Sequence, residues 1–272
     1  MALYHTVFHG SPVAVSWTIL GSGSAGNCAY LEAGQTRLLI DAGLSARQIR
    51  LRLAALGRVV ESLSGILITH EHGDHVQALK VFAARHDIPI YCNRFTREAI
   101  EYQMGLKLAC RVFETGTSFA IGDVEVESFS VPHDAQDPVG FLVRTQTVNV
   151  GVLTDLGHVT RLVLERLRPA QVLLVEANHD VRLLQEDTRR PWTTKQRILS
   201  RHGHLSNEAA AAMVETLADG ALQHVFLGHL SRDCNRPELA HAAVAGRLQA
   251  LGAQHIQITT ATQDTPTQEL RF

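Results

Sequence analysis

Short apolar runs alternate with segments of helical period along most of this chain. The runs are bounded by glycine, asparagine, aspartate or serine, as buried strands usually are. They predict strands at Val15–Leu20, Cys28–Glu32, Arg37–Ile40, Gly65–Thr69, Ile88–Tyr91, Ser118–Ile121, Val124–Phe129, Gly140–Val143, Val148–Leu153, Val172–Glu176, Val225–Leu227 and His255–Thr259. The segments between them predict helices over Ala46–Leu56, Val76–Arg85, Arg94–Gln103, Val159–Arg166, Asn207–Ala218 and Pro237–Leu251.

This alternation occurs in both halves of the chain and predicts an α/β fold. Two βαβ-rich halves with weak symmetry suit an αββα four-layer sandwich, in which two facing mixed β-sheets are flanked by helices. No linker divides the chain, so residues 17–260 are predicted to form a single domain. We expect residues 1–16 to be a flexible leader and the polar tail 261–272 to fray.

The segment THEHGDH, residues 69–75, follows one of the predicted strands and carries metal-binding side chains. These are His70, His72, Asp74 and His75. In an extended segment, His70 and His72 point the same way, which leaves Asp74 and His75 for a second ion as the chain turns into a helix. A lone histidine would be read as a surface residue, but this spacing indicates a ligand cluster. Imidazole and carboxylate suit zinc, and also manganese or iron.

The HxHxDH string resembles that of the metallo-β-lactamase superfamily, and the resemblance extends along nearly the whole chain. It implies the metallo-β-lactamase fold, with a cleft at the edge of the sandwich that binds two divalent metal ions. The resemblance also implies a later histidine, a bridging aspartate and a final histidine. Residues of these types follow predicted strands in the same order, as His133, Asp155 and His229. The usual string has serine at the position of Gly73, which is not a ligand.

The resemblance implies how these residues share two ions. One ion would be held by His70, His72 and His133, and the other by Asp74, His75 and His229, with Asp155 bridging both. A hydroxide between two divalent ions becomes a nucleophile near neutral pH. Asp41 follows a predicted strand and would either make an Asx turn or hydrogen-bond a ligand imidazole from outside; the resemblance favours the second role.

Composition limits the functional classes. Of 272 residues, 45% are hydrophobic and 19% charged, as in a globular protein, and the net charge of -2 provides no overall attraction for nucleic acid. Four cysteines without a CxxC pair indicate reduced thiols and a cytoplasmic protein. Residues 1–16 lack lysine and arginine, so they do not form a signal peptide, and no run reaches membrane-spanning length.

The segment GHLSNE, residues 203–208, precedes an alanine-rich helix and suggests a site for phosphate. Ser206 is a good N-cap, and a phosphate could dock on the free amides of that helix end, beside His204 and Asn207. Five basic residues lie upstream between 189 and 201 with no acid among them, and Trp192 within this stretch could stack on a base. The alternative for the basic stretch is an ordinary solvated helix face.

A narrower resemblance rests on LGSGSAGN, LLIDAGLS, VEANHD, GHLSNE and HLSRDCNRPE, in that order. These segments look like those of the YycJ (WalJ) subgroup of the superfamily, near ribonuclease Z, ribonuclease J and the cyclic phosphodiesterase PhnP. The resemblance implies that His204, Ser206 and Asn207 face substrate phosphate, and that His204 helps to protonate the leaving oxygen. Glu176 would support the site from outside the ligands. Catalysis would then rest on Asp74, Asp155 and His204.

The sequence therefore predicts a dinuclear metal-dependent hydrolase, with zinc favoured over manganese or iron. The leading hypothesis is a phosphodiesterase that acts as a 5′→3′ exonuclease, on DNA rather than RNA. The alternatives are a small-molecule hydrolase on the same site, either a cyclic phosphodiesterase or a β-lactamase, and a metal-binding sensor or scaffold without turnover. The sequence leaves the oligomeric state open, including that of a homodimer.

Overall fold

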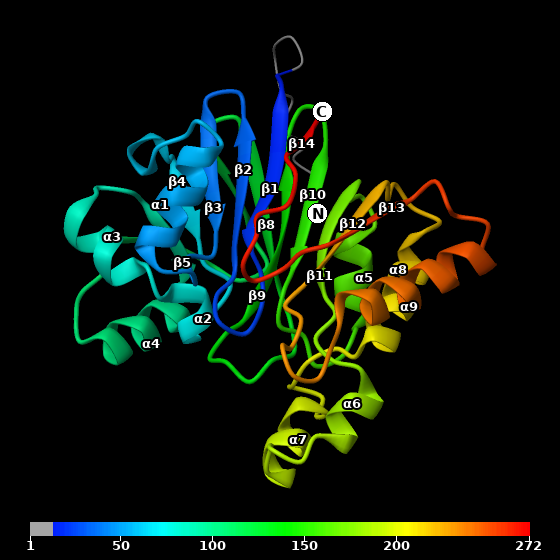
Figure 1. The fold of residues 1–272 in the computed structure, drawn as a ribbon. Coiled ribbons are helices and arrows are strands. Elements are labelled where there is room, and N and C mark those ends of the chain that lie inside the picture. Colours follow the sequence, from blue (N-terminus) through cyan, green and yellow to red (C-terminus); the bar gives the residue numbers. More distant parts are fainter. Residues whose placement is uncertain (1–12) are drawn as a thin grey trace.

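A computed structural model describes residues 13–272. Within these residues the chain forms two seven-stranded β-sheets that face each other, with helices on their outer faces (Figure 1). The predicted αββα four-layer sandwich is therefore confirmed. The predicted leader lies mostly outside the described residues, but its last two, Val15 and Ser16, belong to the first strand.

The first sheet has the order β14-β1-β2-β3-β4-β5-β6. Its strands are β1 (Val15–Gly21), β2 (Cys28–Ala33), β3 (Thr36–Ile40), β4 (Gly65–Leu67), β5 (Ile90–Asn93), β6 (Cys110–Phe113) and β14 (Leu270–Arg271). Strands β1 to β3 form an antiparallel meander, and β3 to β6 run parallel because helices connect them.

The second sheet has the order β13-β12-β11-β10-β9-β8-β7. Its strands are β7 (Ser118–Ile121), β8 (Val124–Ser130), β9 (Val139–Arg144), β10 (Asn149–Leu153), β11 (Val172–Glu176), β12 (His224–Gly228) and β13 (Gln257–Thr260). Here too an antiparallel half, β7 to β10, continues into a parallel half, β10 to β13. Both sheets are therefore mixed.

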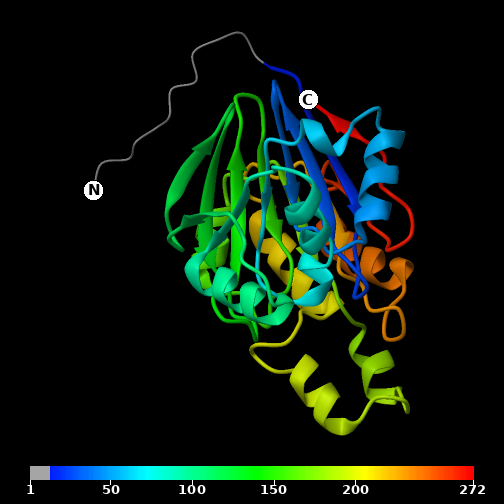
Figure 2. The same cartoon turned by 90° about the vertical axis from the view of Figure 1, so that its left-hand side faces the viewer.

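Helices cover the outer face of each sheet. Over the first sheet lie α1 (Ala46–Ala55), α3 (Leu79–Arg85) and α4 (Arg94–Met104), and over the second lie α5 (Arg161–Leu167), α8 (Asn207–Leu217) and α9 (Pro237–Ala250). The short helices η1 (Val60–Ser62) and α2 (Gly73–Val76) lie in connections. The remaining helices, α6 (Val181–Glu186) and α7 (Trp192–Ile198), form an arm that projects from one edge of the sandwich (Figures 1 and 2).

Three hydrophobic clusters hold these layers together. One fills the space between the sheets and includes Trp17, Phe141 and Phe226, all buried. The other two lie between each sheet and its helices. Buried apolar area is the main favourable term in folding, so the sandwich is stabilised on both faces of both sheets. The loops at the strand ends can therefore carry polar residues on a rigid support.

The structure differs from the sequence prediction around residue 77. A continuous helix over Val76–Arg85 was expected, but the chain forms α2 and α3 as separate helices. The amide of Ala78 donates its hydrogen bond to the carbonyl of Ala42, 2.8 Å away, and not to a carbonyl of the preceding helical turn. A tertiary hydrogen bond thus interrupts the local helical pattern. Helices α6 and α7 and strand β6 were not predicted.

The C-terminal tail is also different from the prediction. It was expected to fray, yet Leu270 and Arg271 form β14 and pair with β1. The amide of Phe272 donates to the carbonyl of Val15 at 2.9 Å, and the side chain of Gln263 is buried against the glycine-rich loop that follows β1. The tail is ordered because it covers the free edge of β1, a partner that composition alone does not reveal.

No helix within residues 13–272 is long and apolar enough to cross a membrane.

Deleting Gln268–Phe272 is expected to lower the free energy of unfolding by about 2–4 kcal/mol, since it removes backbone hydrogen bonds to β1 and exposes apolar surface. Urea denaturation followed by circular dichroism measures this change. The variant Gln268→Ala, which changes only an exposed side chain, serves as the control. An unchanged urea midpoint for the deletion would mean that β14 adds nothing to stability.

Candidate metal centre

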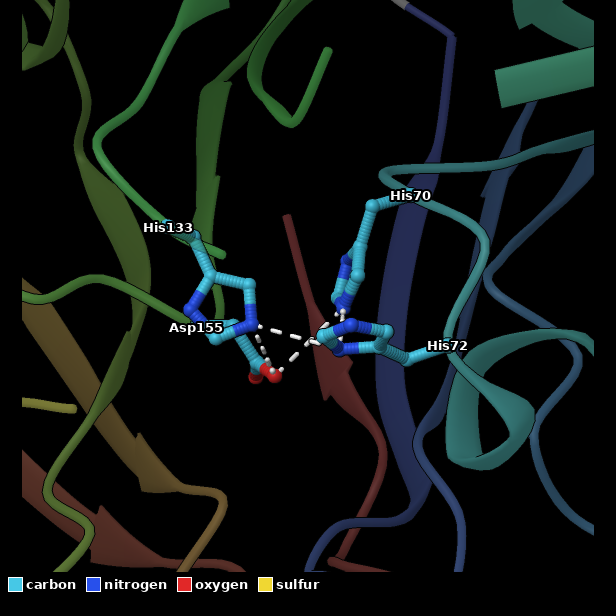
Figure 3. A group of neighbouring side chains, drawn as sticks. All are labelled: His70, His72, His133 and Asp155. Carbon is cyan, nitrogen blue, oxygen red and sulfur yellow. Dashed lines mark hydrogen bonds and ion pairs between the residues drawn. The ribbon is translucent and has the colours of Figure 1, made fainter. Parts of the chain in front are cut away.

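The seven predicted ligands converge at one edge of the sandwich, in the loops that follow β4, β8, β10 and β12. Their ligand atoms fall into groups in which all members lie within 4.8 Å of one another. Four of them, His70, His72, His133 and Asp155, are seen in Figure 3 to point into a common space from three different loops. Residues far apart in the sequence are thus brought together as the motif predicted.

The first group contains those four residues. The Nδ1 atom of His72 lies 3.0 Å from Nε2 of His70 and 3.3 Å from Nε2 of His133. Oδ2 of Asp155 lies 3.5 Å from the same nitrogen of His70 and 3.4 Å from that of His133. Three imidazole nitrogens and a carboxylate oxygen that face one point are the donor set of a tetrahedral or five-coordinate divalent cation.

The second group contains Asp74, His75, Asp155 and His229. Nε2 of His75 lies 3.7 Å from Oδ2 of Asp74 and 3.5 Å from Oδ1 of Asp155. Nε2 of His229 lies 3.2 Å from Oδ2 of Asp74. Asp155 thus turns one carboxylate oxygen toward each group. Its Oδ1 is buried and lies 3.0 Å from Nδ1 of His229, but within the described residues it accepts no hydrogen bond of regular geometry, as expected of an atom placed for a cation.

Hydrogen bonds behind the rings select which nitrogen faces the centre. Nδ1 of His75 lies 2.7 Å from Oδ2 of Asp41, and Nδ1 of His133 lies 3.0 Å from the carbonyl of Gly203. The hydroxyl of Thr69 lies 3.0 Å from Nδ1 of His70 and donates to Asp41. When these Nδ1 atoms carry the proton, the Nε2 lone pairs point inward, as metal binding requires. Asp41 therefore acts on the imidazole of His75 from behind and does not form only an Asx turn.

An unusual backbone conformation positions two residues of the centre, Asp41 and His229. Among the described residues, Asp41 (φ 58°) and His229 (φ 52°) are the non-glycine residues in the left-handed region. That conformation is unfavourable for most side chains and persists where the surrounding structure enforces it. Both residues directly follow strands, β3 and β12, and the turn directs the side chain of His229 into the centre and that of Asp41 to the outer side of His75.

Charge in the centre is arranged for cation binding. Burial lowers the pKa of His70 to about 3, and burial also lowers the pKa of His133, so both rings are uncharged at neutral pH and offer lone pairs. Burial disfavours the charged form of Asp155, but His229 and His75 outweigh it and hold the pKa of this carboxyl well below its usual range. The donor set therefore fits a divalent metal ion.

Glu176, at the end of β11, lies beside the second group. Its Oε2 lies 2.7 Å from Nδ1 of His204 and 2.8 Å from Nδ1 of His229, and its Oε1 accepts from the amides of Leu156 and Leu205. Burial disfavours the charged form of His204, but the Glu176 carboxylate outweighs it and raises the pKa of this imidazole. His204 thus lies at the rim of the centre, where the buried carboxylate of Glu176 holds it and favours its protonated form.

The GHLSNE segment is only partly arranged as predicted. Ser206 caps α8, because its side chain accepts from the amide of Ala209. Asn207, expected to face phosphate, is buried, and its amide makes reciprocal hydrogen bonds with Asn235 at 2.9 and 2.8 Å. The side chain of Asn207 therefore holds the loop after β12 against α8, and its predicted contact with phosphate is not supported by this geometry.

The basic stretch between residues 189 and 201 is largely neutralised. Arg189 and Arg190 pair with Asp187 and Asp233, and the short contact of Arg197 with Asp134 forms another ion pair. The ammonium group of Lys195 donates to the carbonyl of Gln185, and the side chain is buried. The absence of acids within this segment was misleading, because one compensating acid, Asp187, lies just before it and the others, Asp134 and Asp233, come from other loops. Trp192 is exposed on α7.

Comparison with known proteins places this geometry in a family. Residues 36–229 match the family model described as the beta-lactamase superfamily domain. The chain belongs to the metallo-β-lactamase superfamily. It is 40% identical over 243 residues to a protein named exodeoxyribonuclease WalJ from Streptococcus pneumoniae serotype 2, covering 88% of this chain and 90% of that one.

A second relative and a solved structure show the same family likeness. The chain is 37% identical over 243 residues to a protein named exodeoxyribonuclease YycJ from Bacillus anthracis, covering 88% of this chain and 91% of the relative. The structure of the metallo-β-lactamase fold protein YhfI from Bacillus subtilis superposes with a TM-score of 0.68 at 14% identity, over 95% of this chain and all of that one (100%). Membership of this superfamily, with the donor groups described above, implies a hydrolase that uses divalent metal.

Two contributors to the centre were missed in the sequence. Asn27 ends the glycine-rich loop after β1, and its Nδ2 lies 3.2 Å from Nε2 of His75 and 3.4 Å from Oδ2 of Asp74. Thr69 links Asp41 to His70. The loop reads as a tight turn, and Asn27 carries no signal by itself. Thr69 adjoins the motif, and its polar hydroxyl at the end of an apolar strand is a signal that could have been used.

Gly43 controls how closely the Asp41 loop approaches the metal-binding loop. A Cβ at this position would overlap the backbone carbonyl of Asp74, whereas a Cβ at Gly73 would meet nothing within 4 Å. We expect Gly43→Ala to cost about 1–3 kcal/mol or more of stability and to lower metal content. The matched variant Gly73→Ala should stay within about 1 kcal/mol of the original chain.

Thermal unfolding and metal analysis of purified protein measure both effects. Equal metal content and stability in the two variants would show that the close contact at Gly43 is not required for the centre.

Proposed function

We propose that this protein is a dinuclear metal-dependent phosphodiesterase that removes nucleotides from DNA ends, in the 5′→3′ direction. The observation that carries this proposal is the shared carboxylate of Asp155 between two complete donor groups, with the His204–Glu176 pair at their rim. Support comes from relatives named exodeoxyribonucleases, which cover most of the chain at 40% and 37% identity.

In this proposal each donor group holds one ion. One is held by His70, His72 and His133 and the other by Asp74, His75 and His229, with Asp155 shared. Zinc is favoured because the donors are mainly imidazole, and manganese and iron accept the same ligands. Bound divalent cations would acidify a water molecule and withdraw charge from the phosphate oxygens. Asp41 and Thr69 keep the imidazoles of this set oriented.

His204 supplies the proton that the leaving oxygen needs. Its Nδ1 is held by Glu176, so the other nitrogen of the ring is free to face substrate. A nucleotide oxygen leaves poorly as an alkoxide, and a general acid at this position speeds its departure. His204 lies beside the rings of His133 and His229, with centroids 5.2 Å from each, so it reaches the rim of both donor groups.

Substrate phosphate would meet the start of α8. Ser206 caps this helix, and the amides of Asn207, Ala209 and Ala210 already donate to His179 and Ser206. The support for an anion here is therefore the partial positive charge of the helix end. The basic stretch contributes less than its composition suggests, since most of its charges are paired. We infer a cytoplasmic location, supported by four cysteines that form no disulfide in the structure.

Replacing His204 by Ala tests its role as a proton donor. We expect kcat on DNA to fall roughly 10²–10⁴-fold, the usual contribution of general acid catalysis. The loss should be much smaller on methyl 4-nitrophenyl phosphate, because 4-nitrophenol leaves without protonation. The exposed neighbour His202, replaced by Ala, is the control. Equal losses on both substrates would assign His204 to positioning or metal binding and not to proton transfer.

The substrate is tested with end-labelled DNA duplexes that carry 5′-phosphate or 5′-hydroxyl ends. A matched RNA and a β-lactam are assayed beside them. Stepwise loss of nucleotides from the 5′ end of DNA is expected, with no loss after chelation or in His72→Ala, while the exposed His241→Ala stays active. Turnover of the β-lactam or of a small cyclic diester, without cleavage of either polymer, would replace the proposed function by that of a small-molecule hydrolase.

A further inference from the structure

Glu71 stands within the metal-binding loop but takes no part in either donor group. In an extended segment successive side chains point to opposite sides, so Glu71 points away from the space that His70 and His72 enter. Its Oε1 accepts a hydrogen bond from the amide of Gln136 at 2.8 Å. Its Oε2 is buried and has no hydrogen-bond partner within the described residues. A buried carboxylate oxygen without a partner is unfavourable, so a donor supplied by a ligand beside it would stabilise it.

Glu71 lines a cavity of about 320 Å³ beside the metal-binding loop. The other lining residues come from the loop after β8 and from helix α4. Helix α4 lies next to α2 in the fold (Figure 1). It is lined by Glu71, Phe95, Glu98, Tyr102, Gln103 and Gln136. Its size is at the low end for ligand pockets and suits one planar ring system.

Two aromatic side chains on α4 remain uncovered at this cavity. Phe95 is 53% exposed and Tyr102 is 90% exposed. Exposed aromatic rings beside a nucleic-acid site are the usual platform on which unpaired bases stack. Glu71, which forms no ion pair within the described residues, would repel a phosphate group, whereas Glu98 is paired with Arg94 at 2.8 Å. The cavity is therefore suited to a base and not to the backbone of a nucleic acid.

The polar groups of the lining also select among bases. Carboxylate oxygens accept hydrogen bonds, and adenine, cytosine and guanine each carry an amino group that donates them. Thymine lacks the amino group, and its one ring donor, N3–H, lies between two carbonyl oxygens that a carboxylate repels. An amino-bearing base would therefore satisfy Oε2 of Glu71 better than thymine, and a poorly satisfied buried carboxylate oxygen is costly.

We propose that this cavity binds the base of the nucleotide next to the scissile phosphate, and that Glu71 favours amino-bearing bases over thymine. This inference rests on the proposed function, since it assigns a base-specific subsite to the same centre. The base stacks on Phe95 and Tyr102 while the adjoining phosphate lies at the metal groups. The subsite makes cleavage depend on the nucleotide at that position.

The test uses DNA substrates that differ only in the nucleotide beside the cleaved bond. The full chain is expected to cleave the cytosine substrate with a kcat/KM about 10-fold above that of the thymine substrate. In Glu71→Gln this ratio should fall to near unity, because the amide keeps an acceptor for Gln136 but offers thymine a donor. In Phe95→Ala/Tyr102→Ala, KM should rise roughly 10-fold more for DNA than for methyl 4-nitrophenyl phosphate.

A matched control removes an exposed apolar side chain from another helix. Leu51, on α1, is 57% exposed, and Leu51→Ala should keep both the base ratio and the KM values. Wild-type ratios in Glu71→Gln, or equal KM changes on both substrates in the double variant, would overturn the subsite.

A second measurement separates this inference from the proposed function. Binding of deoxycytidine and thymidine to metal-free protein is followed by saturation-transfer NMR, which requires no cleavage. Stronger binding of deoxycytidine that is lost in Glu71→Gln would support the subsite even if DNA were not cleaved. Absence of DNA cleavage alone would count against the nuclease function, and absence of nucleoside binding would overturn the subsite.

Discussion

The carboxylate of Asp155 is the interaction on which the site depends. It is buried among imidazoles, with Oδ2 facing His70 and His133 and Oδ1 facing His75 and His229. A buried carboxylate is costly unless opposite charge surrounds it, and divalent metal held by these donor groups would supply that charge. Because one side chain belongs to both donor groups, the distance between the groups is fixed by the width of a carboxylate. The other ligand side chains need only to point toward the two oxygens of Asp155.

The ligand side chains are positioned by the ends of strands in both sheets. His70 follows β4 of the first sheet, whereas Asp155 and His229 follow β10 and β12 of the second. The cluster of buried residues between the sheets holds their separation constant. A change in the packing of Trp17 or Phe141 would therefore alter the distances between the ligands. The geometry of the metal centre thus depends on the packing of the core.

The fold class could be predicted from the sequence because apolar runs mark strands. Four candidate ligands could be named because the HxHxDH spacing holds them within a few residues, whereas His133, Asp155 and His229 followed from the family resemblance. The role of Asn207 was not predictable, because its partner Asn235 lies 28 positions away and the pair forms only when α8 meets the loop after β12. The same holds for the basic stretch, whose partners Asp134 and Asp233 are supplied by other loops. Tertiary partners decide whether a polar residue is free to act.

The hydrogen bond from His133 to the carbonyl of Gly203 has a consequence for how this protein can change. Gly203 closes the arm formed by α6 and α7, and a Cβ there would overlap the carbonyls of Arg197 and Ile198. A change in the length of the segment that returns from α7 would move the carbonyl and turn the imidazole of His133 with it. The length of this returning segment is therefore constrained by the metal centre.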